Sequence, residues 1–198
     1  MSSSARAHRA RSWARALALS LTVTAGIAVG AGTTAQAADL PLNALVFAAG
    51  QRLLIADDAA SAKWGTVTPV NDPPREKQVL DTVTRLAAEA GLDQAFVYRV
   101  FRDQIDATEA VEYARFAQWK LLPHTAPTVR PDLSTARATI DALNVAMVDQ
   151  LHRHRHVLTS PGCEALVVAA VADTIGRLAL GADYAVALTR ATASYCSL

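Results

Sequence analysis

Residues 93–120 read DQAFVYRVFRDQIDATEAVEYARFAQWK and predict one long helix. At about 100° per residue, a stripe roughly 100° wide collects the side chains of Val97, Phe101, Ile105, Thr108, Glu112, Phe116 and Trp119. A stripe this regular is expected to be buried against other helices. Burying the Thr108 hydroxyl and the Glu112 carboxyl without partners would cost on the order of a few kcal/mol. These two residues therefore either have polar partners or line a cavity that a polar molecule enters.

The first predicted helix also carries polar side chains, Arg52 and Lys63, on an otherwise apolar face. They are separated by almost three whole helical turns, so both project from one face, about 16 Å apart along the axis. That face is otherwise formed by Leu45, Ala48, Ala56 and Ala59. Both cations could extend past the alanines to solvent, and Thr108 and Glu112 could simply bond a nearby carbonyl and a basic residue. We favour the alternative, in which all four line one cavity with complementary charges.

The rest of the chain also predicts helices, without any convincing alternating strand. Proline and glycine mark the breaks, at residues 66–74, 123–131 and 160–162 and near Gly181. We predict a single all-α domain of about six helices: Leu40–Trp64, Pro74–Ala90, Asp93–Lys120, a helix from Asp132 or Ser134 to Leu158, Cys163–Leu178 and Ala182–Tyr195.

The first 37 residues have the pattern of a secretory signal peptide. Four arginines precede the apolar stretch Ala16–Val29, which is too short to span a bilayer, and Ala35-Gln36-Ala37 forms an A-x-A cleavage site. The arginines are not adjacent, which favours the general secretory route over the twin-arginine route. We therefore predict a signal peptide at 1–37, a helical domain at 38–198, and export to the periplasm or the extracellular space.

Removing 37 of the 198 residues would leave 161, enough for one domain with a sizeable core. Because the leader carries four of the 19 basic residues and no acid, 15 basic residues remain against 18 acidic ones, a net charge of about −3. This balance offers no basic surface for nucleic acid or for an anionic membrane.

Cys163 and Cys196 are the only cysteines, and export would place them where disulfides persist. We predict one bridge between them. A metal-binding or catalytic role for two cysteines this far apart is not expected.

Other motifs favour no competing chemistry. His152, His154 and His156 alternate with Arg153 and Arg155 and lack the HExxH pattern, so they indicate a solvated face rather than a metal site. The sequence has no G-x-S-x-G motif and no glycine-rich phosphate loop. The second predicted helix opens with Arg75 and Glu76 after Asp72. An arginine in a first turn could bind an anion or form a surface salt bridge.

In chain order, these polar residues resemble the active-site pattern of AroQ-class chorismate mutases: Arg52, Lys63, Asp72-x-x-Arg75-Glu76 and Thr108-x-x-x-Glu112. A signal peptide, an all-helical chain and a terminal cysteine pair make the resemblance closer to their secreted gamma subclass. The resemblance covers the whole chain after residue 37, and residues 98–120 are its most specific part.

The resemblance implies an AroQ-type fold and the rearrangement of chorismate to prephenate, a unimolecular step that needs no cofactor, metal or covalent intermediate. The chemistry fits the residues. The substrate is a dianion that must be held in a compact chair, and the breaking ether bond gathers negative charge on its oxygen. Such an enzyme needs cations for two carboxylates and donors at one ether oxygen.

By similarity, Arg52 and Arg75 would clamp carboxylates, and Lys63 would donate to the ether oxygen. Glu112 would stand on the other side of that oxygen, where many family members have glutamine. A glutamate donates only when protonated. Burial beside a dianion would raise the pKa of Glu112, so the resemblance predicts activity that persists or improves toward mildly acidic pH.

The resemblance assigns four further residues to substrate binding. Glu76 would hold the ring hydroxyl, Thr108 would contact a carboxylate, Asp72 would shape the pocket mouth, and Arg137 would supply an extra arginine. Some secreted relatives have a glutamine where this chain has Val79. Because Val79 cannot form a hydrogen bond through its side chain, the ring hydroxyl would be left to Glu76. In short intracellular members the comparable arginine comes from the partner chain, so Arg137 predicts a complete site within each protomer of a homodimer.

Two rival interpretations remain. One is a secreted helical protein that binds anions without turnover, and the other is a purely structural helical module. Every polar position that the chemistry needs is filled, whereas a binding protein that had lost turnover should have lost Lys63 or Glu112 first.

Overall fold

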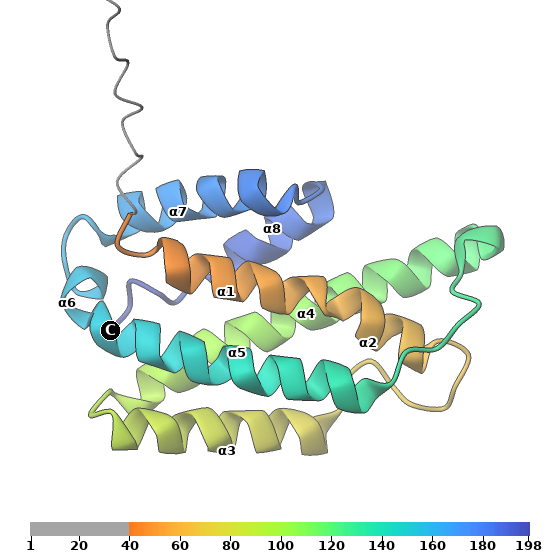
Figure 1. The fold of residues 1–198 in the computed structure, drawn as a ribbon, viewed down its shortest axis with the longest axis horizontal. Coiled ribbons are helices and arrows are strands. Elements are labelled where there is room, and N and C mark those ends of the chain that lie inside the picture. Colours follow the sequence, from red (N-terminus) through yellow and green to blue (C-terminus); the bar gives the residue numbers. More distant parts are fainter. Residues whose placement is uncertain (1–39) are drawn as a thin grey trace, which may run out of the picture. The chain divides into compact units, whose positions relative to one another are not determined.

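Helices make up most of residues 40–198, the part of the chain that the computed structural model describes (Figure 1). No strand occurs in this part, which confirms the predicted all-α class. The helices are α1 (Asn43–Leu54), α2 (Ala56–Lys63), α3 (Pro73–Glu89), α4 (Gln94–Leu121), the 3₁₀ helix η1 (Pro123–Thr125), α5 (Leu133–Arg153), α6 (Arg155–Leu158), α7 (Cys163–Leu178) and α8 (Ala182–Ala191). The predicted signal peptide, 1–37, lies outside the described residues. None of the described helices combines the length and the apolar character that crossing a membrane requires.

Two of the six expected helices are each divided in two. The first breaks at Ile55, between α1 and α2, and the fourth breaks at His154, between α5 and α6. Ile55 keeps near-helical backbone angles, φ −72° and ψ −13°, and α2 continues close to the line of α1 in Figure 1. Neither break carries the proline or glycine from which the other helix ends were predicted. The last helix also ends earlier than expected, at Ala191, and turns follow it.

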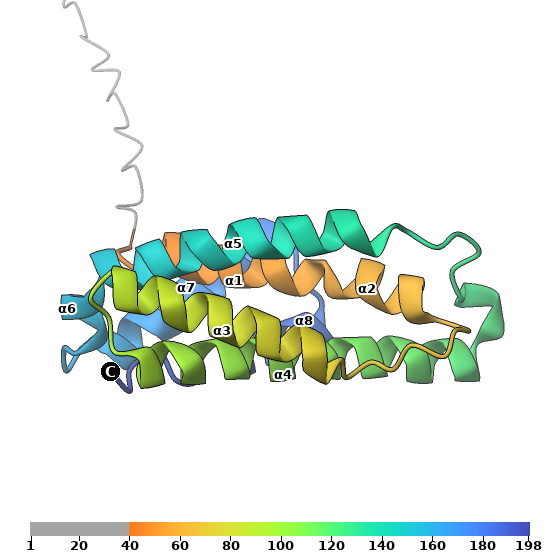
Figure 2. The same cartoon turned by 90° about the horizontal axis from the view of Figure 1, so that it is seen from below.

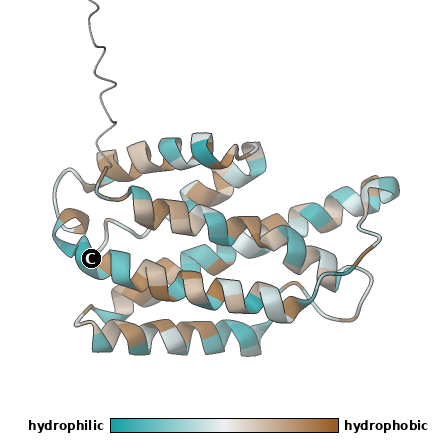
Figure 3. Cartoon of the chain, viewed as in Figure 1, coloured by the Kyte–Doolittle hydropathy of each residue, from teal (hydrophilic) through white to brown (hydrophobic). Residues whose placement is uncertain are grey.

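Helix α4 carries the stripe predicted from residues 93–120. Asp93 caps its N-terminus, since the Asp93 carboxylate accepts a hydrogen bond from the N–H of Phe96 at 2.7 Å. Val97, Phe101 and Glu112 of the stripe are buried, which confirms the predicted burial. In Figure 3 polar and apolar residues are mixed along each helix, as expected for helices with one face against the core.

Helices α2 to α5 pack against one another beside α1. Both α2 and α3 contact α4 and α5, and in Figure 2 the long helices α4 and α5 run past α3 toward one end and α2 toward the other. Helix α1 contacts α4, α5, α7 and α8, which places it at the centre of the packing. Many of the largest fully buried side chains come from α1, α4, α5, α8 and the C-terminal turn. They include Leu45, Leu53, Phe96, Phe101, Met147, Leu151, Leu188 and Tyr195.

Gly50 allows α1 and α7 to approach closely. A Cβ atom at this position would lie 2.8 Å from Cγ2 of Thr174 and 2.9 Å from Cδ1 of Leu178, both shorter than normal contacts. Thr174 is fully buried and β-branched, so its side chain has little freedom to move away. The close approach therefore depends on the absence of a side chain at Gly50.

The predicted disulfide is present. Cys163 at the start of α7 is bonded to Cys196, which follows α8, with their Cα atoms 5.8 Å apart. The bridge closes the segment that contains α7 and α8 and fixes the C-terminal turn beside the beginning of α7.

Replacing both cysteines, Cys163→Ser with Cys196→Ser, should lower the free energy of unfolding. The bonded residues are 33 positions apart, and closing a loop of that length stabilises by about 3–4 kcal/mol in the chain-entropy model. Urea unfolding followed by circular dichroism would measure the difference. A reducing agent should bring the wild type to the level of the variant and leave the variant unchanged, and equal midpoints without reductant would contradict the prediction.

Candidate active site

A pocket lies among α1, α2, α3, α4 and α5, with about 630 Å³ of empty space, part of it open to solvent. It brings together all eight residues that the sequence singled out as candidates for the site: Arg52, Lys63, Asp72, Arg75, Glu76, Thr108, Glu112 and Arg137. Five helices contribute them, so the grouping depends on tertiary structure. The predicted roles of the individual residues remain predictions.

Arg52 is held from two helices. Its Nε donates to Oδ1 of Asn144 on α5 at 3.0 Å, and its Nη1 lies 3.3 Å from Oγ1 of Thr108 and 3.4 Å from the carbonyl of Gln104, both on α4. Arg52 is only 4% exposed. Burial, with the nearby charge of Arg75 adding to it, lowers the pKa of Arg52 to about 10, so its guanidinium remains charged at neutral pH.

Lys63 and Glu112 form a buried ion pair. The Nζ of Lys63 lies 2.8 Å from Oε2 of Glu112 and also donates to the carbonyl of Val70 at 2.7 Å. The two residues are 7% and 4% exposed. Neither Arg52 nor Lys63 reaches solvent past the alanines, so that alternative is wrong for both. Burial raises the pKa of Glu112, although the charge and hydrogen bond of Lys63 oppose the shift.

The two interpretations of Thr108 and Glu112 both hold. Thr108 donates from Oγ1 to the carbonyl of Gln104 one turn back, at 2.8 Å, and Glu112 pairs with Lys63, as the simpler interpretation expected. Both residues nevertheless line the pocket. These groups therefore have internal partners and also face the pocket.

Two ion pairs join α3 to α5 beside the pocket. Nη2 of Arg75 lies 2.6 Å from Oδ1 of Asp141, and Nη2 of Arg137 lies 3.2 Å from Oδ2 of Asp72. Asp72 also caps α3, because its Oδ1 accepts a hydrogen bond from the N–H of Arg75 at 3.2 Å. The salt-bridge explanation for an arginine in the first turn of α3 is therefore confirmed, and Arg75 still lines the pocket.

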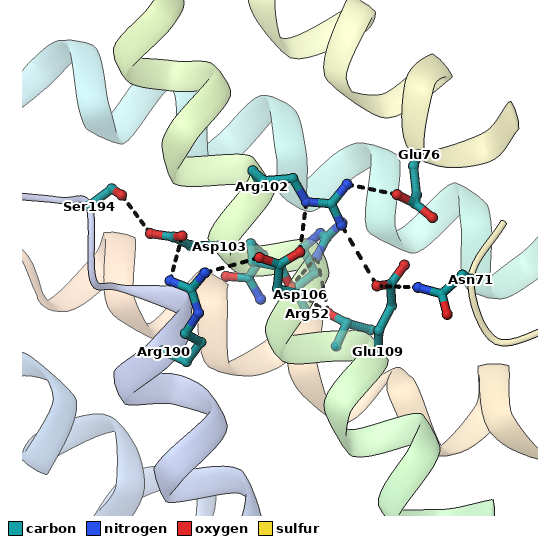
Figure 4. Close-up of polar contacts among 11 residues, drawn as sticks. Arg52, Asn71, Glu76, Arg102, Asp103, Asp106, Glu109, Arg190 and Ser194 are labelled. Atoms are coloured by element: carbon teal, nitrogen blue, oxygen red, sulfur yellow. Dashed lines mark hydrogen bonds and ion pairs between the residues drawn. The ribbon is translucent and has the colours of Figure 1, made fainter. Parts of the chain in front are cut away.

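Glu76 and Glu109 form an acidic edge of the pocket (Figure 4). Nη1 of Arg102 lies 2.7 Å from Oε2 of Glu76, and the amide of Asn71 donates to Oε2 of Glu109 at 2.7 Å. Burial, together with a hydrogen bond to Glu76 and the charge of Glu76, raises the pKa of Glu109 to about 7, while Arg102 opposes the shift. Near neutral pH the two carboxyls therefore carry less than two full negative charges.

The pocket can hold a small anion with two carboxylates. Its four lining cations, Arg52, Lys63, Arg75 and Arg137, come from α1, α2, α3 and α5, so they would reach a ligand from different sides. Guanidinium groups bind carboxylates through two parallel hydrogen bonds, and an ammonium adds a compact charge. Charges in a partly enclosed pocket interact more strongly than in water.

The described residues contain no group of three or more His, Cys, Asp or Glu side chains placed to hold a metal ion. His152, His154 and His156 lie near the junction of α5 and α6 and do not line the pocket.

Four residues that matter to the site were missed by the sequence analysis: Asn144, Asp141, Arg102 and Glu109. The first two follow Arg137 at helical spacing, so Arg137, Asp141 and Asn144 share one face of α5. The stripe test used for residues 93–120 would have found them. Glu109 adjoins Thr108 at the edge of that stripe. No sequence signal distinguishes Arg102 from the other charged residues of α4.

Comparison with known proteins finds relatives that match most of the chain. Residues 43–113 match the family described as chorismate mutase type II. A Mycolicibacterium smegmatis protein named secreted chorismate mutase is 45% identical over 169 residues, which span 84% of this chain and 93% of that protein. A Mycobacterium tuberculosis protein of the same name is 44% identical over 152 residues, spanning 77% of this chain and 76% of that protein.

Solved structures agree with the sequence relatives. A chorismate mutase structure from Burkholderia thailandensis matches with a TM-score of 0.75 and 31% identity, covering 80% of this chain and 100% of that chain. A second, from Burkholderia phymatum, matches with a TM-score of 0.74 and 32% identity, covering 79% and 96%. With the family match, the relatives and the shared fold, this chain belongs to the type II chorismate mutase family.

Proposed function

We propose that the protein is an exported chorismate mutase that converts chorismate to prephenate in the pocket described above. The observation that carries the proposal is the convergence of four cations, Arg52, Lys63, Arg75 and Arg137, on one pocket of a single chain. Family membership and relatives named secreted chorismate mutase support it. No cofactor or metal is needed, because the reaction moves electrons only within the substrate.

The proposed mechanism relies on conformational restraint and on charge. Arg52 and Arg75, with Arg137, would bind the two substrate carboxylates and hold the side chain over the ring in the compact chair. Restraining both ends of one molecule removes conformations that cannot react. The buried position of Arg52 and its contacts from α4 and α5 give it a fixed direction, which such restraint requires.

The ether oxygen would lie between Lys63 and Glu112. As the C–O bond breaks, that oxygen gains negative charge, and an ammonium together with a protonated carboxyl would stabilise it. In the structure these two groups pair with each other at 2.8 Å. A substrate oxygen would replace this pairing, and the proton on Glu112 would remove the repulsion between a carboxylate and the dianion.

The other predicted residues would orient the substrate. Glu76 would accept a hydrogen bond from the ring hydroxyl, and Thr108 would contact a carboxylate. Asp72 would cap α3 at the pocket mouth and hold Arg137 of α5 there until the substrate binds. Substrate carboxylates would draw Arg75 from Asp141 and Arg137 from Asp72, at least in part.

Export would use residues 1–37 as a cleaved signal peptide, with the enzyme beginning at Ala38. The A-x-A site in the sequence and the names of the two mycobacterial relatives support this assignment.

Arg75→Ala and Lys63→Ala should each lower kcat/KM by about a hundredfold or more, because each removes a charged contact to the dianion or its ether oxygen. Purified protein starting at Ala38 would be assayed by loss of chorismate absorbance and by acid conversion of the product to phenylpyruvate. Lys77→Ala is the matched control, since Lys77 lies on α3 two residues from Arg75 and pairs with Asp81 on the surface. Folded wild type without turnover would favour an anion-binding protein.

The activity should decline as pH rises through the pKa of Glu112 in the complex, since the proton that Glu112 donates is then lost. The raised pKa of Glu112 moves this decline upward, toward neutral pH, and the substrate dianion should raise the pKa further. Glu112→Gln donates at any pH and should flatten the decline. Profiles of kcat between mildly acidic and alkaline pH would test this, with Glu89→Gln as a surface control. A wild-type profile that rises steadily with alkalinity would exclude the role.

The chain should form a homodimer, as the resemblance implies, with a complete site in each protomer. Light scattering coupled to size exclusion should give twice the mass of one chain. Because every candidate site residue lines a pocket of one chain, activity per chain should stay constant on dilution below the dissociation constant. A fall in activity that follows dissociation would place part of the site on the partner.

A further inference from the structure

Arg102 on α4 contacts two carboxylates of the pocket, although it is not itself a lining residue. Its Nη1 lies 2.7 Å from Oε2 of Glu76, and its Nη2 lies 3.7 Å from Oε2 of Glu109. Its Nε lies 2.7 Å from Oδ1 of Asp106. One guanidinium thus joins acids from α3 and α4, as Figure 4 shows. Its planar fork gives each of these contacts a fixed direction.

Asp106 is held in turn by Arg190 on α8. Nη2 of Arg190 lies 3.0 Å from Oδ2 of Asp106, and Nη1 lies 2.6 Å from Oδ1 of Asp103. Ser194 donates to the other oxygen of Asp103 at 2.6 Å (Figure 4). Ser194 is two residues from the disulfide-bonded Cys196. The Ser194 hydrogen bond and the ion pairs that follow it therefore connect the C-terminal turn, which the disulfide fixes, to the acidic edge of the pocket.

Arg102 contacts the two acids of the pocket edge, Glu76 and Glu109, unequally. Arg102 lies closer to Glu76, at 2.7 Å, than to Glu109, at 3.7 Å, so its stronger contact is with Glu76. A carboxylate oxygen of Glu76 can accept a hydrogen bond from a hydroxyl. A glutamate side chain is flexible, and productive binding needs its oxygens held to within a fraction of an ångström.

We propose that Arg102 is a positioning residue for the rearrangement: it fixes the Glu76 carboxylate at the pocket edge, while Asp106 and Arg190 fix Arg102. The inference rests on the proposed function, in which Glu76 accepts the hydrogen bond of the ring hydroxyl. Arg102 does not touch the substrate. Its loss acts through Glu76, and this dependence can be measured.

A double-mutant cycle with Arg102→Gln and Glu76→Gln tests the proposal on the full mature chain. Arg102→Gln alone should lower kcat/KM for chorismate by about ten- to a hundredfold, which is the range for a hydrogen bond to a charged group. Most of the loss should appear in KM, because the ring hydroxyl is bound in both ground and transition states. In the Glu76→Gln background the same change should alter kcat/KM by no more than about twofold.

Three further variants make the test specific. Arg85→Gln is the matched control, since Arg85 lies on α3 and pairs with Glu89 on the surface, and it should leave kcat/KM unchanged. Arg102→Lys keeps a cation near Glu76 and should recover part of the loss. If Arg102→Gln does not fold, Arg190→Gln takes its place in the cycle, with a smaller loss that also disappears in the Glu76→Gln background.

Two results from an active wild type would overturn the positioning role. One is an equal loss in both backgrounds, which would mean that Arg102 acts through the fold or another residue. The other is unchanged kcat/KM in Arg102→Gln. A folded wild type that does not convert chorismate at all would instead overturn the proposed function, and this inference with it.

Discussion

Arg52, Lys63 and Glu112 bury their charged groups between helices, where each group must have a polar or oppositely charged partner. Lys63 and Glu112 are almost inaccessible to water, and an unpaired charge at such a depth would cost several kcal/mol, about 3–5 when one partner of a buried pair is removed. The contact of 2.8 Å between them therefore fixes α2 against α4. Arg52 imposes the same condition on α1, α4 and α5 through Asn144 and Thr108.

Charge also sets the spacing of the outer helices. Arg75 with Asp141, and Arg137 with Asp72, bridge α3 and α5 at the pocket. These pairs are more exposed than the Lys63–Glu112 pair and are weaker for that reason. They lie beside the pocket, and under the proposed function their arginines would turn to the carboxylates of the substrate. An apolar interface in the same place would leave no space and no cations for a dianion.

The C-terminal helices contribute to the pocket without lining it. Helix α8 packs on α4 and is tied to α7 by the disulfide, and Arg190 carries its influence to Asp106 and Arg102. Helix α8 is therefore connected to the edge of the pocket through ion pairs. A region far from the pocket in sequence thereby affects the position of the side chains at its edge.

Much of the fold and of the site could be predicted from the sequence, because helical periodicity assigns each residue to a face. That rule placed Thr108 and Glu112 on the buried face of α4 and Arg52 and Lys63 on one face of the first helical segment. The breaks at Ile55 and His154 were not predicted, since no proline or glycine marks them. Helical spacing also puts Asp141 and Asn144 on one face with Arg137. It does not say that Asn144 contacts Arg52, that Asp141 contacts Arg75 or that Arg102 contacts Glu76. Those contacts join residues far apart in the chain, and they depend on how the helices cross and rotate against one another.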